Sequence, residues 1–217
     1  MGPTTHNSSK EELILEAAEQ VFVEKGLSGA RMQEIADRAG INKTLLHYYF
    51  RTKENIFARI LRQVFSTFLQ KIDASIPDDA PFPAALRMFI DSFVDYIAGH
   101  PKIPMFVMQE LSRGGGIVSE VLAATLDRIS FPNRFLRLIS QEVEAGRLEA
   151  VDPAQTVITV LGSCIYYFVA EPIIRAVLSK VQPDLVYDRA AFVARRKEEI
   201  FKVIYYGLKK RGSGDAD

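Results

Sequence analysis

Four side chains able to contact nucleic acid follow directly after a glycine-containing turn. They are Lys43, Thr44, His47 and Tyr48, within the segment RMQEIADRAGINKTLLHYYF at residues 31–50. Lysine can donate hydrogen bonds to guanine O6 and N7, and a tyrosine can meet a phosphate or a thymine methyl group. Thr44 and His47 are three residues apart, so a helix would place them on one face. These residue types at this spacing indicate a short helix that reads DNA.

The elements that must position these residues are two short helices and the turn between them. One buried face of the first helix is predicted by three apolar residues at helical spacing: Ile35, Ala36 and Ala39. Gly40 suits the left-handed residue that ends a helix, and Asn42 suits the N-cap of the next. Two helices joined so closely form a helix-turn-helix, whose second helix, about Lys43 to Tyr49, can enter a major groove.

The charge distribution supports this interpretation more than the total charge does. Lys and Arg number 27, as do Asp and Glu, so the net charge is zero. Between residues 42 and 62, however, five basic residues meet a single acidic one, Glu54. The basic residues are Lys43, Arg51, Lys53, Arg59 and Arg62. Such a cluster suits a phosphate backbone, although a solvated helix face would look the same.

Catalytic and metal sites are not predicted. The only cysteine, Cys164, excludes an intramolecular disulfide and a cysteine-rich zinc site, and its apolar neighbours suggest a small core residue. The three histidines, His6, His47 and His100, are far apart. No zinc-protease, nucleophile-elbow or phosphate-loop motif occurs. We therefore expect neither an enzyme nor a cofactor.

Composition is that of a globular protein of the cytoplasm. The 217 residues are 48% hydrophobic and 25% charged. The N-terminus, MGPTTH, lacks the apolar core of a signal peptide. The longest apolar stretch expected in one helix, Val157 to Val169, is shorter than the roughly 20 residues of a membrane span. We expect a cytoplasmic location and no membrane partner.

Helical periodicity continues through the whole chain without strand alternation, which predicts an all-α fold. A first helix near residues 10–25, ended by Gly26, should brace the two short ones in a DNA-binding domain of residues 8–53. Residues 54–211 are expected to form a larger helical domain for effector binding and dimerisation, entered through a long connecting helix at 52–72. Residues 212–217 are expected to be a disordered tail. Further helices are predicted at 84–98, 104–111, 117–129, 131–145, 153–169 and 188–210. Asp152 and Asp188 can cap the last two of them, and Pro172 either kinks the helix that starts at 153 or begins a new one.

Three segments in this order resemble the TetR family of bacterial transcriptional regulators: AAEQVFVEKG, MQEIADRAGINK and LLHYYFRTKENIF. They cover about the first quarter of the chain. The resemblance implies an all-helical homodimer whose N-terminal domains bind a palindromic operator in double-stranded DNA. It also implies a C-terminal domain that binds a small effector and then releases the DNA. Such proteins are usually repressors.

The resemblance also implies roles for single residues. Lys53 stands where the family commonly holds a phosphate, and Gln33 has a position that can reach DNA. His47 replaces the family's usual tyrosine, and Ala30 replaces the Thr or Ser that precedes the second helix. The complete set of expected DNA-binding residues is Gln33, Asn42, Lys43, Thr44, His47, Tyr48 and Lys53.

Effector and dimer contacts are expected in the C-terminal domain. Aromatic and methionine side chains suit a small, largely apolar effector; the candidates are Phe89, Phe93, Met105, Met108, Tyr166 and Tyr167, with Gln109, Arg137 and Glu142 as polar partners. The last two helices are the expected dimer contact, through Phe192, Ile200, Ile204 and Leu208. Either set would also fit plain core packing. A helical dimer that binds small molecules without reading DNA is the alternative function.

Overall fold

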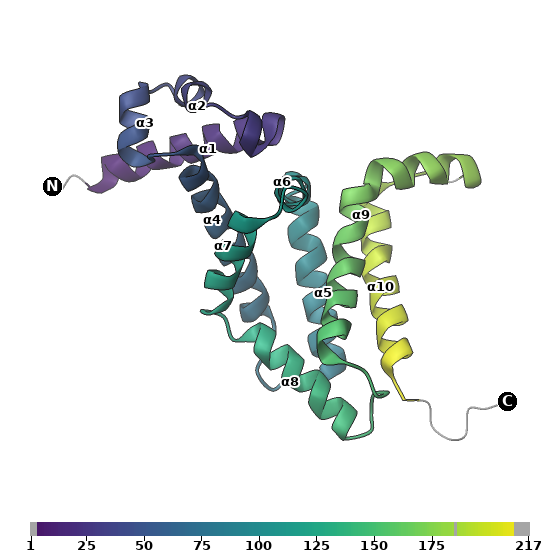
Figure 1. The fold of residues 1–217 in the computed structure, drawn as a ribbon. Helices are drawn as coiled ribbons and strands as arrows, with labels where there is room; N and C mark the ends of the chain where they lie inside the picture. The colour runs from purple at the N-terminus through teal and green to yellow at the C-terminus, as the bar shows by residue number, and fades with distance from the viewer. Residues whose placement is uncertain (1–3, 185, 211–217) are drawn as a thin grey trace. The chain divides into compact units, whose positions relative to one another are not determined.

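The computed structural model describes residues 4–184 and 186–210, with side chains described from Lys10 onward. Over these residues the chain is all-helical, which confirms the expected fold class. The expected tail at 212–217 lies outside the described residues. The helices are α1 (Thr4–Gly29), α2 (Met32–Arg38), α3 (Lys43–Tyr49), α4 (Lys53–Ser75), α5 (Phe82–Gly99), α6 (Lys102–Leu111), α7 (Gly116–Leu126), α8 (Phe131–Glu144), α9 (Pro153–Val181) and α10 (Arg189–Leu208) (Figure 1).

The helices group into two compact units, described separately below. Unit 1 combines residues 4–67 with Met105–Arg128, and unit 2 combines Phe68–Pro104 with the chain from Ile129 onward. The division expected from the sequence, at residues 53 and 54, is a division by function and stays a prediction. Packing divides the chain differently, because α6 from Met105 onward and all of α7 belong to unit 1, where Phe106, Val118 and Val121 are buried.

The core of unit 1 is centred on three aromatic rings. Phe22 of α1 meets Phe57 of α4 edge-on, with ring centroids 5.4 Å apart, and Phe106 of α6 lies 4.5 Å from Phe57. Phe106 is only 7% exposed. Aromatic pairs of this kind add about 0.5–1.5 kcal/mol beyond the burial of their area. A residue distant in sequence therefore completes the core that supports the short helices α2 and α3.

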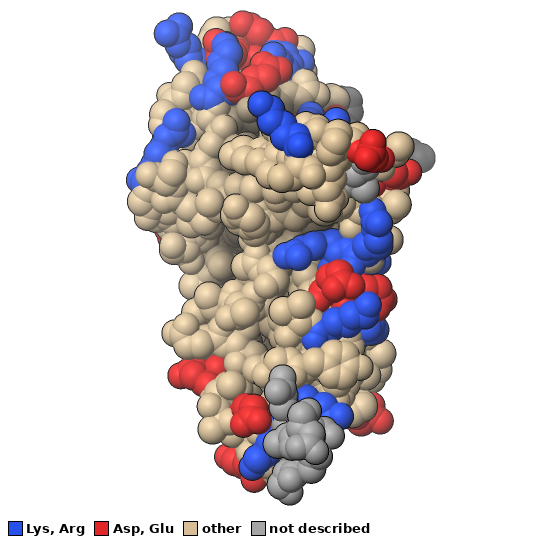
Figure 2. Space-filling view, turned by 90° about the vertical axis from the view of Figure 1, so that its right-hand side faces the viewer, with Lys and Arg blue, Asp and Glu red and all other residues tan. Residues whose placement is uncertain are grey.

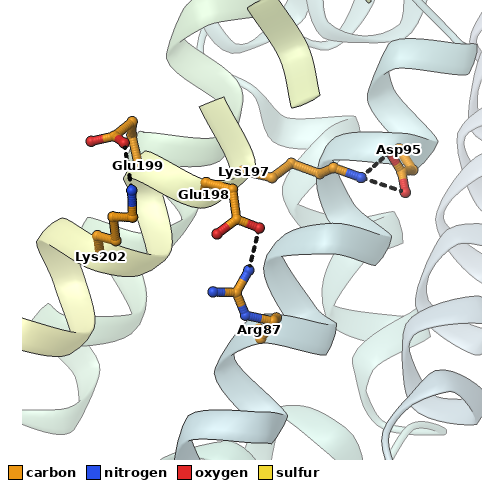
Figure 3. A network of polar contacts seen from close by, with 6 residues as sticks. All are labelled: Arg87, Asp95, Lys197, Glu198, Glu199 and Lys202. Atoms are coloured by element: carbon orange, nitrogen blue, oxygen red, sulfur yellow. Dashed lines mark hydrogen bonds and ion pairs between the residues drawn. The ribbon is translucent and has the colours of Figure 1, made fainter. Parts of the chain in front are cut away.

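The core of unit 2 is built on the apolar face of α5, whose buried residues recur at three- and four-residue steps as expected. Phe89 of α5 stacks on Phe131 and Phe135 of α8, with ring centroids 5.4 and 5.6 Å away. On the other side α5 packs against α10. There the ion pairs Arg87–Glu198 and Lys197–Asp95 join the two helices at 2.7 and 2.9 Å (Figure 3). Such exposed pairs contribute little stability, so burial holds α5 and α10 together.

Helix α9 is longer than the sequence suggested. It was expected at 153–169, but it continues to Val181 and contains Pro172. Proline removes one backbone hydrogen bond and kinks a helix without always ending it, and Figure 1 shows α9 bending in its C-terminal part. Its length and apolar composition would suffice for a membrane span. A helix in the core of a globular protein can be equally long and apolar. Val160, Cys164 and Tyr167 of α9 are buried in the core of unit 2.

The expected side-chain caps are present. The Asp152 carboxylate accepts a hydrogen bond from the Gln155 backbone N–H, and the Asp188 carboxylate accepts one from Ala191 N–H, both at 2.9 Å. Each satisfies a backbone donor that the first turn of a helix leaves unpaired. The starts of α9 and α10 therefore follow from local sequence alone.

Candidate nucleic-acid interface

The turn between α2 and α3 has the geometry predicted from its sequence. Gly40 has φ of 66°, in the left-handed region where glycine carries no steric penalty. The Asn42 side-chain oxygen accepts a hydrogen bond from the Leu45 backbone N–H at 2.7 Å and so caps α3. The Ile41 N–H donates to the Ala36 carbonyl at 3.0 Å, which closes the end of α2. Local chemistry thus fixes where α3 begins.

The buried side of α3 is narrow. Leu46 is 0% exposed and Phe50, directly after the helix, is also buried in the unit 1 core. Leu45 and Tyr49 are half-buried beside them. Because α3 has only seven residues, these contacts hold it from one side only and leave its other side to solvent.

The exposed side of α3 presents the residues expected to meet DNA. Lys43, Thr44, His47 and Tyr48 are all exposed, and Tyr48 retains 80% of its accessible surface. His47 Nδ1 lies 3.1 Å from the backbone oxygen of Arg51. A carbonyl oxygen only accepts, so Nδ1 carries the proton in this contact and Nε2 stays free for another partner. Large exposed aromatics and cations at one place suit an interface.

Lys53 is engaged differently from the expectation. Its Nζ donates hydrogen bonds to the backbone carbonyls of Ser28 and Ala30, at 3.0 and 3.1 Å, and its side chain is half-buried. Two of its three N–H donors therefore tie the start of α4 to the chain just before α2. In this structure Lys53 positions the helix-turn-helix, and one donor remains for a phosphate.

Gln33 and Asn42 also spend their polar atoms within unit 1. The Gln33 amide donates to the Asp37 carboxylate at 2.7 Å, one turn along α2, and the Asn42 oxygen is used as the cap. Both side chains remain exposed. A contact from either residue to DNA stays a prediction.

Two ion pairs attach α2 to α1. Arg38 makes a bidentate contact with Glu24 at 2.8 and 3.0 Å, and Lys25 pairs with Glu34 at 2.7 Å. The hydrogen bond from Lys25 lowers the pKa of Glu34 below its ordinary value. This stabilisation is therefore complete above the ordinary carboxyl pKa and is lost as the pH falls through the lowered one. The four charges serve the fold of unit 1.

Sequence reasoning overlooked Arg31. It occupies the N-cap position of α2, makes no side-chain cap hydrogen bond there, and is exposed. The local excess of positive charge between residues 42 and 62 is also smaller than the sequence suggested, because Arg59 pairs with Glu11 at 3.1 Å. The signal of Arg31 in the sequence is a basic residue at the N-cap position of α2, directly after Ala30.

A substitution at Lys53 separates its two roles. We expect Lys53→Met to lower the free energy of unfolding by about 1–2 kcal/mol, since two hydrogen bonds from a charged donor are lost. Binding to specific and random DNA should weaken equally. The measurement is urea unfolding followed by circular dichroism, with Lys71→Met on the exposed side of α4 as the matched control. Lys53 would instead be a phosphate ligand if stability did not change and the slope of the logarithm of the binding constant against the logarithm of the salt concentration became shallower by about 0.9.

The residues expected to line an effector pocket are divided between the units and between core and surface. In unit 2, Phe89, Phe93 and Tyr167 are buried and Tyr166 is exposed. In unit 1, Met105 and Met108 are exposed. None of the six lines either of the two cavities whose walls the structure describes. Helical spacing identifies apolar faces, but it does not tell which faces neighbouring helices already fill.

The polar residues suggested as effector partners also separate. Gln109 lies in unit 1, whereas Arg137 lines a cavity of unit 2. Glu142 forms two hydrogen bonds with the Arg147 guanidinium, at 2.6 and 2.7 Å, which lower the pKa of the Glu142 carboxyl. Glu142 is therefore occupied within the protein, and Arg137 is the one candidate at a cavity wall.

The residues expected at the dimer interface complete the core of unit 2 instead. Ile200 and Ile204 are buried, Leu208 packs half-buried against the same core, and Phe192 stacks on Tyr167 with centroids 4.9 Å apart. A dimer contact through these four residues stays a prediction, because in this chain the stripe faces α5 and α9. The same two helices carry other apolar side chains that are exposed: Ile158, Tyr166, Ile173 and Val177 on α9, and Val203 and Tyr206 on α10.

Cys164 is a core residue, as its neighbours suggested. It is fully buried in α9, and burial raises the pKa of its thiol to about 12. The thiol therefore stays protonated at neutral pH and is a poor nucleophile.

Comparisons with known proteins agree with this geometry. Residues 14–60 match the family model of bacterial regulatory proteins of the tetR family. The chain is 28% identical over 204 residues to the HTH-type transcriptional regulator RutR of Escherichia coli K12, covering 94% of this chain and 92% of RutR. It is 30% identical over 107 residues to the transcriptional repressor NicS of Pseudomonas putida, covering 46% and 48%.

A solved structure shares the fold over almost the full length. The regulator FadR of Bacillus subtilis, solved in complex with stearoyl-CoA, superposes with a TM-score of 0.66 at 18% identity. The alignment covers 90% of this chain and 98% of FadR. These relatives are regulators and not enzymes. The helix-turn-helix at α2 and α3, the match to the family model and the near full-length relatives agree: residues 14–60 form a DNA-binding domain of the tetR type, and the chain resembles transcriptional regulators over almost its full length.

Proposed function

We propose that this regulator is a homodimeric repressor that binds a palindromic operator and is released from it by a small, largely apolar effector. The observation that supports DNA reading most directly is α3, which is capped by Asn42, anchored by Leu46 and exposed at Lys43, Thr44, His47 and Tyr48. As a regulator of transcription it would work in the bacterial cytoplasm.

The contacts with DNA divide into those that select sequence and those that position the protein. Lys43 lies in the first turn of α3, nearest to base edges in the docking geometry of this motif, and is proposed to donate to guanine. Thr44 and His47 would share that face, and Tyr48 would meet the backbone or a thymine methyl group. Arg31 and Arg51 are exposed cations available for phosphates.

Dimerisation supplies the second recognition helix. A two-fold axis would place two copies of α3 about 34–36 Å apart, or at a multiple of that distance, on successive turns of DNA. The proposed interface is the apolar surface of α9 and α10 defined by Ile158, Tyr166, Ile173, Val177, Val203 and Tyr206. Figure 2 faces the side on which these helices lie, and uncharged side chains cover much of it. An exposed apolar surface of this kind is typical of a protein–protein interface.

Release is proposed to be a shift of population. An effector that prefers a conformer unsuited to the operator lowers the affinity for DNA. The largest possible decrease is the ratio of the effector's affinities for the two conformers. Helices α4 and α6 each begin in one unit and end in the other. Both are therefore candidates to transmit the change between the effector and the recognition helices.

The test is a gel shift with the full chain on the DNA next to its own gene. We expect a complex whose affinity falls steeply with salt and that survives an excess of random DNA. Binding no tighter than to random DNA would favour the alternative, a helical protein that binds small molecules without reading DNA.

A further inference from the structure

Unit 2 contains a cavity that none of the expected effector residues lines, apart from Arg137. Its volume is about 280 Å³. The loop after α4, including Pro77 and Ala80, forms one wall, the first turns of α5 contribute Ala85, and α8 forms the opposite wall. All of these residues belong to unit 2, and Figure 1 places α8 near the loop that joins α4 to α5.

The apolar part of the cavity suits a flat molecule. Phe131, Phe135 and Leu138 of α8 line it. The two phenylalanine rings stack on each other with centroids 5.2 Å apart, and they are buried with the rest of the unit 2 core. Phe131 and Phe135 are 4% and 2% exposed, so only a small part of each ring reaches the cavity wall, and the core holds that part in place.

One of the two arginines at the cavity is already neutralised. The Arg134 guanidinium pairs with Asp78, lies 3.9 Å from Asp73, and donates to the Ile76 backbone oxygen at 2.9 Å. Its side chain is largely buried and stands 5.6 Å from the centroid of the Phe131 ring. Arg134 therefore acts as a fixed part of the wall, joining the loop to α8.

The other arginine has a different environment. Arg137 is exposed, lines the cavity, and makes no ion pair or hydrogen bond among the described residues. Gln141 lines the same cavity four residues later, so the two side chains are neighbours on one face of α8. A guanidinium fork and an amide donor side by side match the two oxygens of a carboxylate. Asp78 lines the same cavity, but its charge is paired with Arg134.

We propose that this cavity binds a compact aromatic carboxylate, with its ring against Phe131, Phe135 and Leu138 and its carboxylate on Arg137 and Gln141. The volume of about 280 Å³ lies just below the range for ligand cavities, roughly 300–1,000 Å³. It therefore fits one or two fused rings and excludes a long acyl chain. That this carboxylate is also the effector that releases DNA rests on the proposed function, whereas the binding itself does not.

The binding test uses 2-naphthoate, with the neutral isostere 2-naphthamide, titrated calorimetrically into the full-length protein. We expect 2-naphthoate to bind at least about tenfold more tightly than 2-naphthamide, since only the carboxylate forms charge-assisted hydrogen bonds. No heat of binding for 2-naphthoate, or equal affinity for the two probes, overturns the proposal.

Substitution locates the site. Arg137→Gln should lower the affinity for 2-naphthoate about tenfold and leave that for 2-naphthamide unchanged. Because Arg137 is exposed and has no partner among the described residues, the variant should fold like the parent, which thermal unfolding will check. Arg195→Gln, an exposed arginine of α10 away from the cavity, is the matched control and should bind as the parent does. Equal loss in both variants, or no loss in Arg137→Gln, overturns the assignment to this cavity.

The same variants separate the site from the function. If the carboxylate is the effector, saturating 2-naphthoate should weaken operator binding by the parent protein and by Arg195→Gln, but not by Arg137→Gln. If 2-naphthoate binds through Arg137 and operator affinity does not change, the site stands and its role in DNA release is refuted. If operator binding itself fails, the calorimetric result still decides the site.

Discussion

Val203→Glu is expected to convert the proposed dimer into a monomer and to reduce operator affinity by about 100-fold or more. Val203 is 72% exposed on α10 and lines a hollow of about 390 Å³ between the first turns of α9 and the last turns of α10. A carboxylate there would be buried without a partner in the proposed interface, at a cost of several kcal/mol. A monomer has one recognition helix, so it loses the increase in affinity, about 10²–10⁴-fold, that linking two binding modules provides. Sedimentation equilibrium and gel shifts measure the two effects.

Ala74→Glu is the matched control for this substitution. Ala74 is an exposed residue of α4 in unit 2, away from the proposed interface, so the same added charge should leave both dimerisation and DNA binding unchanged. A Val203→Glu protein that remains dimeric and binds the operator normally would show that this surface of α9 and α10 is not the interface.

Phe106→Ala is expected to destabilise unit 1 by about 3–5 kcal/mol, the usual cost of emptying a buried phenylalanine site. Phe106 packs against Phe22 and Phe57, although it lies more than forty residues after Phe57 in sequence. The cavity left behind would loosen the helices that hold α3. Denaturant unfolding should therefore show an early loss of helicity, with a parallel loss of DNA binding.

The neighbouring Met105→Ala provides the control. Met105 is 47% exposed on the same helix, so its truncation should change stability by no more than about 0.5 kcal/mol. If both variants are equally stable, then α6 does not contribute to the core of unit 1 and the packing described above is wrong.

The features that the sequence predicted well are local. The cap at Asn42, the left-handed Gly40 and the caps at Asp152 and Asp188 each depend on a few adjacent residues. Their chemistry is complete within one turn of helix, so no distant partner is needed to recognise them. The helix-turn-helix and its exposed face could therefore be predicted, together with the all-helical fold.

The features that the sequence did not predict depend on distant partners. Ile200 and Ile204 have the spacing of an apolar stripe, but spacing does not say whether the stripe meets its own protomer or another copy. Phe106 could not be assigned to unit 1 without knowing that α6 packs there. The contacts of Lys53 with Ser28 and Ala30 join residues more than twenty positions apart, so a family position that suggested a phosphate ligand did not reveal a structural role.

The candidate effector site shows the same limit. Aromatic and methionine residues were chosen by type, yet three of the six fill the core and three are exposed. Arg137 was named only as a secondary polar partner. What distinguishes Arg137 is that it forms no ion pair within the part of the chain that the structure describes, whereas Glu142 and Arg134 both do. Tertiary packing decides which charged side chains have partners, and sequence periodicity does not reveal this.

The central claim is that the exposed face of α3 selects a DNA sequence, and Lys43→Ala tests it most directly. Affinities of the parent and the variant should be measured by fluorescence anisotropy, at a fixed salt concentration, on the operator and on random DNA of equal length. We expect operator binding to weaken by about 1–3 kcal/mol and random binding to change much less, so that sequence preference is relaxed. Equal losses on both DNAs would contradict the claim and reduce Lys43 to a phosphate contact.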